Sequence, residues 1–370
     1  MMKEWLYQIY NYILNKIKQY SDNETLYNFN NNFEEYKQGF YPQYNVYVDN
    51  PETKPIGLTN LVNDCYIISF LQILIHTPDF LHILKKACSH GDIDDIIKYL
   101  ILISEYPFNI QIFFYLKKSF KKINPEYSEY HSNDSQEFGI DLINYIINQL
   151  KKPVDESDED DIINFEVKDI ITSKKKAFEK YIQNKISLCE LENLFLFNET
   201  QYFFSLTNNK VKISSNLHIE LTLQKTMNKS ITIEELLYNK YNIDMGNFNV
   251  QSNKILIKSQ LVSIPKILII TINRVLIGER INNSQLIFKQ DLNLDKFIDK
   301  DLFNDSNKKT KYNLYAINRC IHQKKNSHYS CSIKIDKTWY LFDDQKVQKK
   351  QYPDTIYSEN VVGLFYIREI

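Results

Sequence analysis

Glycine is scarce in this sequence, with seven residues in 370, and cysteine occurs only five times. The five cysteines (Cys65, Cys88, Cys189, Cys320 and Cys331) are an odd number and form no C-x-x-C pair. These features argue against a disulfide framework and against a tetrahedral zinc site, so we expect an intracellular, cytoplasmic or nuclear location. The formal net charge is only −1. No nucleic-acid partner is therefore expected.

A long uninterrupted apolar run is also missing. The most apolar segment, residues 66–84, contains Gln72, Pro78 and Asp79, which favours a buried helix followed by a turn over a membrane span. The first twenty residues lack a cleavage site of small residues, while their apolar side chains recur at helical spacing. We expect a helix docked on its own protein there, in preference to a signal peptide or an interfacial membrane helix.

The order of patterns along the chain predicts an α+β fold, with an N-terminal extension over residues 1–50 and one domain over 51–370. Helical spacing dominates about 57–150, and an acidic insertion follows over about 151–190. Within this insertion we expect the run of acids to be a solvated loop and the charged segment 173–185 to be an exposed helix. From about 194 to the C-terminus, short runs rich in Ile, Val, Tyr and Phe predict the strands of an antiparallel sheet.

Cys65 stands at the start of an expected helix. Asn63 and Asp64, just before it, are both good N-cap residues. A thiol at a helix N-terminus meets the positive end of the helix dipole and free N–H groups, which favour the thiolate. This is the environment that a cysteine nucleophile needs, although a buried structural cysteine after a cap would give the same pattern.

A second pattern lies near the C-terminus, in the segment SHYSCSIKIDKTWYLFDDQKV. We expect a hairpin closed by Asp336 and Lys337. On that register Asp343 lies diagonal to His328 on the same face, within reach of its imidazole, whereas Asp344 points away. A three-residue loop would reverse this choice, and the pair could also be a plain surface ion pair.

A cysteine followed far downstream by a histidine and an acid on strands is the order of a papain-like arrangement. GLTNLVNDCYIISFLQ resembles the cysteine box of ubiquitin-specific proteases, G-L-x-N-x-G-N-T-C-Y-x-N-S-x-L-Q. SHYSCSIKI…WYLFDDQKV resembles their histidine box, G-H-Y-x-x-Y…W-Y-x-F-D-D-x-x-V. Three weaker segments, NDSQEFGIDLINYI, IPKILIITINRV and VVGLFYIR, occur in the family's order, so that the resemblance covers roughly residues 57–368.

The resemblance implies a papain-like cysteine protease fold with a helical thumb, an antiparallel β palm and β-strand fingers. It also implies hydrolysis at the C-terminal glycine of ubiquitin, without a metal or an organic cofactor. Cys65 would be the nucleophile, His328 the general base and Asp343 the residue that orients the imidazole. Asn60 matches the asparagine whose side-chain amide helps to stabilise the oxyanion.

The same resemblance marks Asp134, Glu137 and Tyr329 as expected substrate contacts. Acids at Asp134 and Glu137 would meet the arginine-bearing tail of ubiquitin. The D-S-Q-E pattern is also a plain capping box, with Asp134 as N-cap and Glu137 at N3. We expect ubiquitin or ubiquitinated proteins as partners, and a monomer.

Four positions depart from the family pattern, namely Val62 for Gly, Asp64 for Thr, Ile68 for Asn and Ser327 for Gly. A carboxylate at Asp64 would oppose thiolate formation unless it caps the helix in solvent, and Val62 would strain a backbone of positive φ. Bulk at Ser327 would crowd the channel for a Gly-Gly tail. Residues 198–260, the expected fingers, contain no cysteine, so bound zinc is not expected. Two alternatives stay open: a weak or inactive ubiquitin-binding scaffold, and a protease for another ubiquitin-like modifier.

Overall fold

The structure is a computed structural model that describes residues 55–89, 93–107, 109–129, 131–151, 162–166, 169–184, 189–204, 209–223, 230–241, 256–276, 280–303, 309–322 and 327–369. Apart from Pro55, these residues belong to one unit, Ile56–Ile370. The predicted N-terminal extension and the run of acids within the insertion lie outside the described residues.

Helices form the first part of this unit, where apolar residues recur at helical spacing. They are α3 (Cys65–Ile75), α4 (Phe80–Cys88), α5 (Asp95–Glu105), α6 (Ile110–Ser119) and α7 (Ser135–Leu150). Ten of the eleven residues of α3 are buried, as expected of a helix enclosed on all sides. No single described helix is long and apolar enough to cross a membrane, although α3 and α4 pass that test together across an 84° bend.

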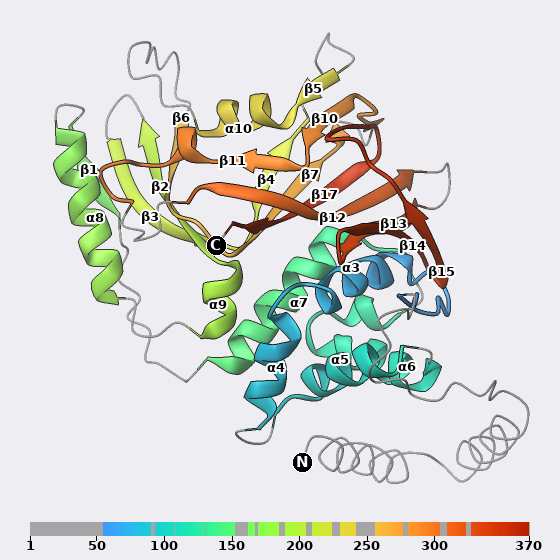
Figure 1. Cartoon of the computed structure of the whole chain (residues 1–370). Helices are drawn as coiled ribbons and strands as arrows, with labels where there is room; N and C mark the ends of the chain where they lie inside the picture. The colour runs from blue at the N-terminus through green and yellow to red at the C-terminus, as the bar shows by residue number, and fades with distance from the viewer. Residues whose placement is uncertain are drawn as a thin grey trace, which may run out of the picture. The chain divides into compact units, whose positions relative to one another are not determined.

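An eight-stranded sheet dominates the C-terminal part. Along its main path the strands are β15 (Lys346–Lys350), β14 (Thr338–Asp343), β13 (Ser327–Ile335), β12 (Lys311–His322), β17 (Val361–Arg368), β7 (Ile267–Asn273) and β4 (Ile219–Thr222), while β11 (Asp291–Asn293) pairs with β12. Neighbouring strands are antiparallel, as predicted, except that β4 runs parallel to β7. In Figure 1 the helices α3–α7 lie together below this sheet, and α10 (Ile233–Tyr241) lies on its other side.

Strand β17 shows why its sequence, VVGLFYIR, is apolar at almost every position. Phe365 packs edge-on against Phe70 of α3, with 5.5 Å between ring centroids. Leu364 and Tyr366 belong to the apolar cluster on the opposite face, which includes Leu237 of α10. A strand covered on both faces needs apolar side chains at odd and even positions alike.

The remaining strands form smaller sheets. Strands β1 (Ile163–Phe165), β3 (Asn209–Asn216), β2 (Phe197–Phe204) and β6 (Leu256–Ser263) make a four-stranded sheet, so strands do occur in the expected fingers. β16 (Thr355–Ser358), β10 (Gln285–Lys289) and β5 (Ser230–Thr232) make a three-stranded sheet, and β8 (Val275–Leu276) pairs with β9 (Arg280–Ile281).

Helix α8 (Ile170–Asn184) packs on β1 and β3, and the short helix α9 (Glu190–Phe195) follows it. The expected helix is present here, but the prediction that it is exposed is wrong for one of its faces. Ala177 is fully buried, and the buried Lys174 pairs with Asp299 at 2.7 Å. Ala177 belongs to an apolar cluster with residues of β2 and β3, which gives a charged helix a buried face.

A buried polar network fixes α3 against α7 and the sheet. The Ser135 hydroxyl donates to the carbonyl oxygen of Tyr66 at 2.8 Å and lies 3.1 Å from the Ser69 hydroxyl. Asn318 of β12 donates its side-chain amide to Ser135 at 2.9 Å. Because these contacts are made within the first two turns of α3, they fix the end of the helix that carries Cys65.

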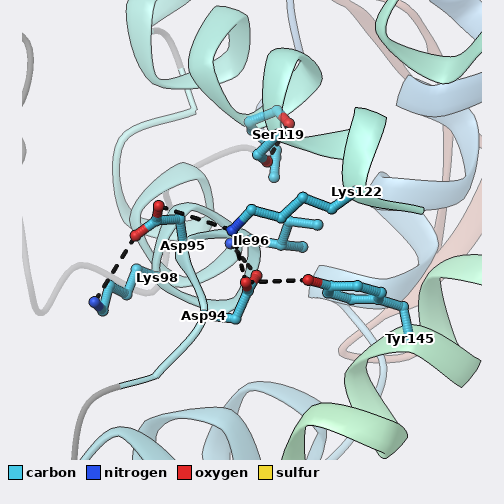
Figure 2. Close-up of polar contacts among 8 residues, drawn as sticks. Asp94, Asp95, Ile96, Lys98, Ser119, Lys122 and Tyr145 are labelled. Atoms are coloured by element: carbon cyan, nitrogen blue, oxygen red, sulfur yellow. Dashed lines mark hydrogen bonds and ion pairs between the residues drawn. The ribbon is translucent and has the colours of Figure 1, made fainter. Parts of the chain in front are cut away.

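One carboxylate joins three parts of the helical region (Figure 2). Asp94 caps α5 by accepting from the backbone N–H of Ile96 at 2.8 Å. It also accepts from Lys122, just after α6, at 2.8 Å and from the Tyr145 hydroxyl of α7 at 3.1 Å. Burial, together with the charge of Asp94, raises the pKa of Tyr145 to about 12.

Alanine at Asp94 is expected to lower the free energy of unfolding by about 2 kcal/mol. Loss of an N-cap costs about 1 kcal/mol, and the partly buried Tyr145 hydroxyl loses its acceptor at a similar cost. Asp95 is the matched control, because its half-exposed side chain makes only 3.9 Å contacts with Lys98 and Lys122. Asp95→Ala should change stability by less than about 0.5 kcal/mol in urea denaturation, and equal losses would refute this role of Asp94.

Candidate active site

Cys65 is the first residue of α3, and its side chain is only 5% exposed. The thiol lies 3.9 Å from the carbonyl oxygen of Ser327, and the backbone N–H of Tyr329 acts to lower the pKa of the thiol. These two residues flank His328 in β13. The fold therefore brings the predicted nucleophile to the strand segment that carries the predicted base.

His328 and Asp343 meet as the predicted hairpin register requires. Strands β13 and β14 are antiparallel and are joined by a two-residue turn, Asp336 and Lys337, both with positive φ. The Nε2 atom of His328 lies 2.6 Å from Oδ1 of Asp343. Their side chains are 36% and 46% exposed, so the pair is open to an incoming substrate.

The prediction that Asp344 points away from this site is wrong. Strand β14 ends at Asp343, and Asp344 lies in the next turn with φ 51°, where strand alternation no longer sets the side-chain direction. Its Oδ2 accepts from the side-chain amide of Asn60 at 3.0 Å. Burial raises the pKa of Asp344, and its hydrogen bond from Asn60 and the charge of His328 only partly oppose this.

The loop before Cys65 packs directly against this turn. Asn60 accepts from the backbone N–H of Asp64 at 3.0 Å through Oδ1, while its Nδ2 donates to Asp344. A Cβ atom at Gly57 would come within 2.2 Å of the backbone oxygen of Asp344. Glycine is therefore required here by a close backbone approach, and the loop and turn form one rigid junction.

The family model of the ubiquitin carboxyl-terminal hydrolases matches residues 56–366. The chain belongs to this family. Among solved structures, the SAGA Ubp8/Sgf11/Sus1/Sgf73 DUB module has a TM-score of 0.61 at 19% identity, covering 85% of this chain and 68% of that chain. The same module bound to monoubiquitin has a TM-score of 0.60 at 17% identity, covering 85% and 69%.

A further structure, of the yeast SAGA module with a mutant Sgf73, has a TM-score of 0.58 at 19% identity and covers 85% of this chain and 69% of that chain. No curated protein matched the sequence. The family match and these likenesses identify the fold as the papain-like α+β fold of ubiquitin-specific proteases, as the sequence predicted.

Two departures from the ubiquitin-specific protease pattern have local explanations. Val62 does not need glycine's conformational freedom, because the positive φ, 55°, falls on Asn63 instead. The condition for backbone strain at Val62 is therefore not met. The Ser327 hydroxyl lies 3.1 Å from Nδ1 of His322, at the end of β12, so its side chain is engaged by the neighbouring strand.

Asp64, where ubiquitin-specific proteases have threonine, does not cap α3 in solvent. Its side chain is 1% exposed and makes no cap hydrogen bond to the helix. It pairs instead with Lys117 of α6, whose Nζ lies 2.5 Å from Oδ1 of Asp64. The condition of a solvated cap is therefore not met, but a buried cation offsets the carboxylate beside Cys65.

The Cys65 thiol does not have the low pKa that its place at a helix N-terminus predicts. Burial raises its pKa, and the charge of Asp344 raises it further. The backbone N–H of Tyr329 and those at the start of α3 lower it, but by less in sum. Desolvation therefore outweighs the helix terminus, and the resting group is a thiol at neutral pH.

Without substrate, alkylation of Cys65 by iodoacetamide is expected to keep accelerating as the pH rises past 9. Because the pKa of this acid lies above its ordinary value of 9.0, the thiolate fraction grows about tenfold per pH unit through neutrality. The rate is measured by mass spectrometry of the peptide that contains Cys65. A plateau reached below pH 7 would mean a stabilised thiolate and would contradict this result.

Asp134 caps α7, as the sequence predicted, by accepting from the backbone N–H groups of Gln136 at 2.7 Å and Glu137 at 3.2 Å. Burial raises the pKa of Glu137, and the neighbouring charges of Asp141, Asp134 and Glu126 raise it further. The start of α7 thus presents an acidic surface. Its contact with the tail of ubiquitin stays a prediction.

Tyr329 is buried, at 5% exposure, and strand alternation places it on the face opposite His328. Burial raises the pKa of its hydroxyl far above the ordinary value, and the charge of Asp134 raises it further, while the backbone N–H of Ser135 at the start of α7 lowers it. Its contact with substrate stays a prediction.

Within the described residues, His328, Asp343 and Asp344 have the spacing of metal ligands, with ligand atoms within 4.8 Å of one another. Asp344 accepts from Asn60, and Asp343 contacts His328, whose two neighbours in β13 lie beside Cys65. All three groups therefore belong to the site already described. That the reaction needs no metal stays a prediction.

Sequence reasoning missed Lys117 and misplaced Asp344. Lys117 lies in the last turn of α6, where a cation is ordinarily solvated, and no local pattern marks it as buried. The error at Asp344 could have been avoided from the sequence alone. A residue that follows the end of a strand at a tight turn should not be assigned to a face by strand alternation.

Proposed function

We propose that this chain is a thiol-dependent deubiquitinase that hydrolyses the amide or isopeptide bond at the C-terminal glycine of ubiquitin. The main support is the junction of α3 and β13, where the Cys65 thiol lies beside the backbone of Ser327 and Tyr329, the two neighbours of His328. Structural neighbours bound to monoubiquitin and to ubiquitin aldehyde support ubiquitin as the partner.

The geometry suits a general-base mechanism. Nε2 of His328 is engaged by Asp343, which leaves Nδ1 to take the thiol proton as Cys65 attacks the glycine carbonyl carbon. The carbonyl oxygen becomes an oxyanion as the C–S bond forms. His328 then returns the proton to the departing lysine amine, and water hydrolyses the thioester to free the C-terminal carboxylate.

Asn60 is proposed as the side-chain donor to the oxyanion. Its amide carries two N–H groups, and one of them is used by Asp344. The other is available for the oxyanion, and such a donor is commonly worth about 10²–10³ in rate. The acids at the start of α7, Asp134 and Glu137, are proposed to pair with the arginine-bearing tail of ubiquitin.

Release of a fluorophore from the C-terminus of ubiquitin tests the proposal, with the same fluorophore on other ubiquitin-like modifiers as comparison. We expect release from ubiquitin at least about 100-fold faster than from the others. Ubiquitin binding without release would favour the inactive scaffold. Release only from another modifier would reassign the substrate.

Asp343→Ala is expected to lower turnover about 100-fold or more, and Asp344→Ala about tenfold. Asp343 contacts the imidazole directly, so its loss leaves His328 without the group that orients it. Asp344 acts through Asn60, which keeps its other bond to the Asp64 backbone. Steady-state hydrolysis of the ubiquitin fluorophore measures both, and a larger loss for Asp344→Ala would contradict this assignment.

A further inference from the structure

A buried ion pair supports the loop that precedes Cys65. The side chains of Lys117 and Asp64 are 3% and 1% exposed, with Nζ 2.5 Å from Oδ1. Two charges removed so completely from water lose most of their hydration, and their attraction recovers this only with good geometry and added hydrogen bonds. Stability alone is therefore a weak reason for this pair, which points to a positional role.

The second oxygen of Asp64 holds the loop in shape. Oδ2 accepts from the backbone N–H of Val62 at 3.3 Å, and the backbone N–H of Asp64 donates to Asn60 at 3.0 Å. Asn63, between them, has a left-handed backbone with φ 55°. Residues 60–64 thus form a tight turn whose contacts converge on Asp64.

The turn ends at the proposed oxyanion donor. Asn60 is held on one side by Asp64 and on the other by Asp344. Lys117 lies on α6, which is anchored by the fully buried Leu116 and the nearly buried Phe113. A continuous set of contacts therefore runs from a rigid helix to the amide of Asn60.

We propose that Lys117 is a positioning residue: its charge keeps the carboxylate of Asp64 buried, so that Asp64 holds the 60–64 turn with the amide of Asn60 facing the forming oxyanion. The effect on oxyanion stabilisation rests on the proposed function, whereas the effect of Lys117 on the conformation of the 60–64 turn does not. Without Lys117, a buried carboxylate loses its countercharge and must move toward water. Its movement would release the backbone N–H of Val62 and loosen the hold on Asn60.

Three variants separate this role from a general loss of fold. Lys117→Met keeps the aliphatic stem and leaves Asp64 unpaired. The double variant Asp64→Asn with Lys117→Met removes both charges and keeps an acceptor for Val62. Lys118→Met is the control, because Lys118 is the next residue of α6 and is exposed, over the ring of Phe114.

Each variant is compared with the wild type by hydrogen exchange of the 58–66 peptide, by kcat and KM on the ubiquitin fluorophore, and by iodoacetamide labelling of Cys65. Lys117→Met should exchange this peptide at least about tenfold faster and lose kcat at least about tenfold, with KM within about threefold. Alkylation should slow less than kcat falls, because the unpaired carboxylate of Asp64 opposes the Cys65 thiolate but displacement of iodide forms no oxyanion. The double variant and Lys118→Met should retain kcat within about threefold of the wild type.

Retention of both kcat and slow exchange in Lys117→Met would overturn the proposal. A double variant with as large a loss of kcat as Lys117→Met would also overturn it. So would loss of the folded circular dichroism spectrum in Lys117→Met and in the double variant, because the ion pair would then have a role in stability alone. A different result is a wild type that shows no turnover while Lys117→Met still speeds hydrogen exchange of the 58–66 peptide. That result would refute the proposed function and uphold the role of Lys117 in holding the 60–64 turn.

Discussion

Alanine at Cys65 is expected to bring hydrolysis of the ubiquitin fluorophore below detection, a loss of at least about 10⁴-fold. In the proposed mechanism the thioester forms on the sulfur of Cys65, and the substitution leaves the proposed ubiquitin contacts at the start of α7 unchanged. Binding of ubiquitin, measured by calorimetry, should change less than about threefold. The separation of the two effects distinguishes a lost nucleophile from a damaged fold.

Cys88→Ala is the matched control, because Cys88 is also a buried free thiol but lies at the end of α4. Its variant should keep turnover within about threefold of the wild type. Turnover retained by Cys65→Ala, or lost to the same extent in Cys88→Ala, would contradict the assignment of the nucleophile.

His328→Ala is expected to lower turnover at neutral pH at least about 10³-fold. Burial raises the pKa of Cys65, so the thiol stays protonated at neutral pH and needs a base as it attacks. The variant should recover about tenfold per pH unit from pH 7 to 9, because the thiolate then forms without help. Turnover measured across this pH range tests both statements.

His322→Ala is the control for this variant. His322 lies at the end of β12, 3.1 Å from the hydroxyl of Ser327 and 3.7 Å from the sulfur of Cys320. Burial lowers its pKa, so it is a neutral imidazole close to the site. Its loss should cost less than about fivefold. Equal losses in the two variants would mean that the base is wrongly assigned.

The helices and the histidine hairpin could be predicted from the sequence because their signals are local. Apolar side chains at helical spacing mark α3 and α7, and the two residues Asp336 and Lys337 set the register of β13 against β14. That register alone selected Asp343 as the partner of His328. The contact at 2.6 Å agrees with it.

The features that sequence reasoning missed depend on burial and on distant neighbours. Helix α10 lies within a strand-rich part of the sequence and is stabilised by packing on several strands. The pairing of Asp64 with Lys117 joins residues 53 positions apart, and neither shows locally that it is buried. The raised pKa of Cys65 likewise follows from desolvation, which a helix-capping pattern does not report.

The most direct test of the site is to treat the full chain with ubiquitin that carries a C-terminal cysteine-reactive group, and to locate the adduct by peptide mapping. We predict one ubiquitin per chain, attached at Cys65 and not at the other four cysteines, with labelling slowed at least about 100-fold in His328→Ala. An adduct at a different cysteine, or none under conditions where ubiquitin binds, would contradict the assignment of Cys65 and His328 to one catalytic site.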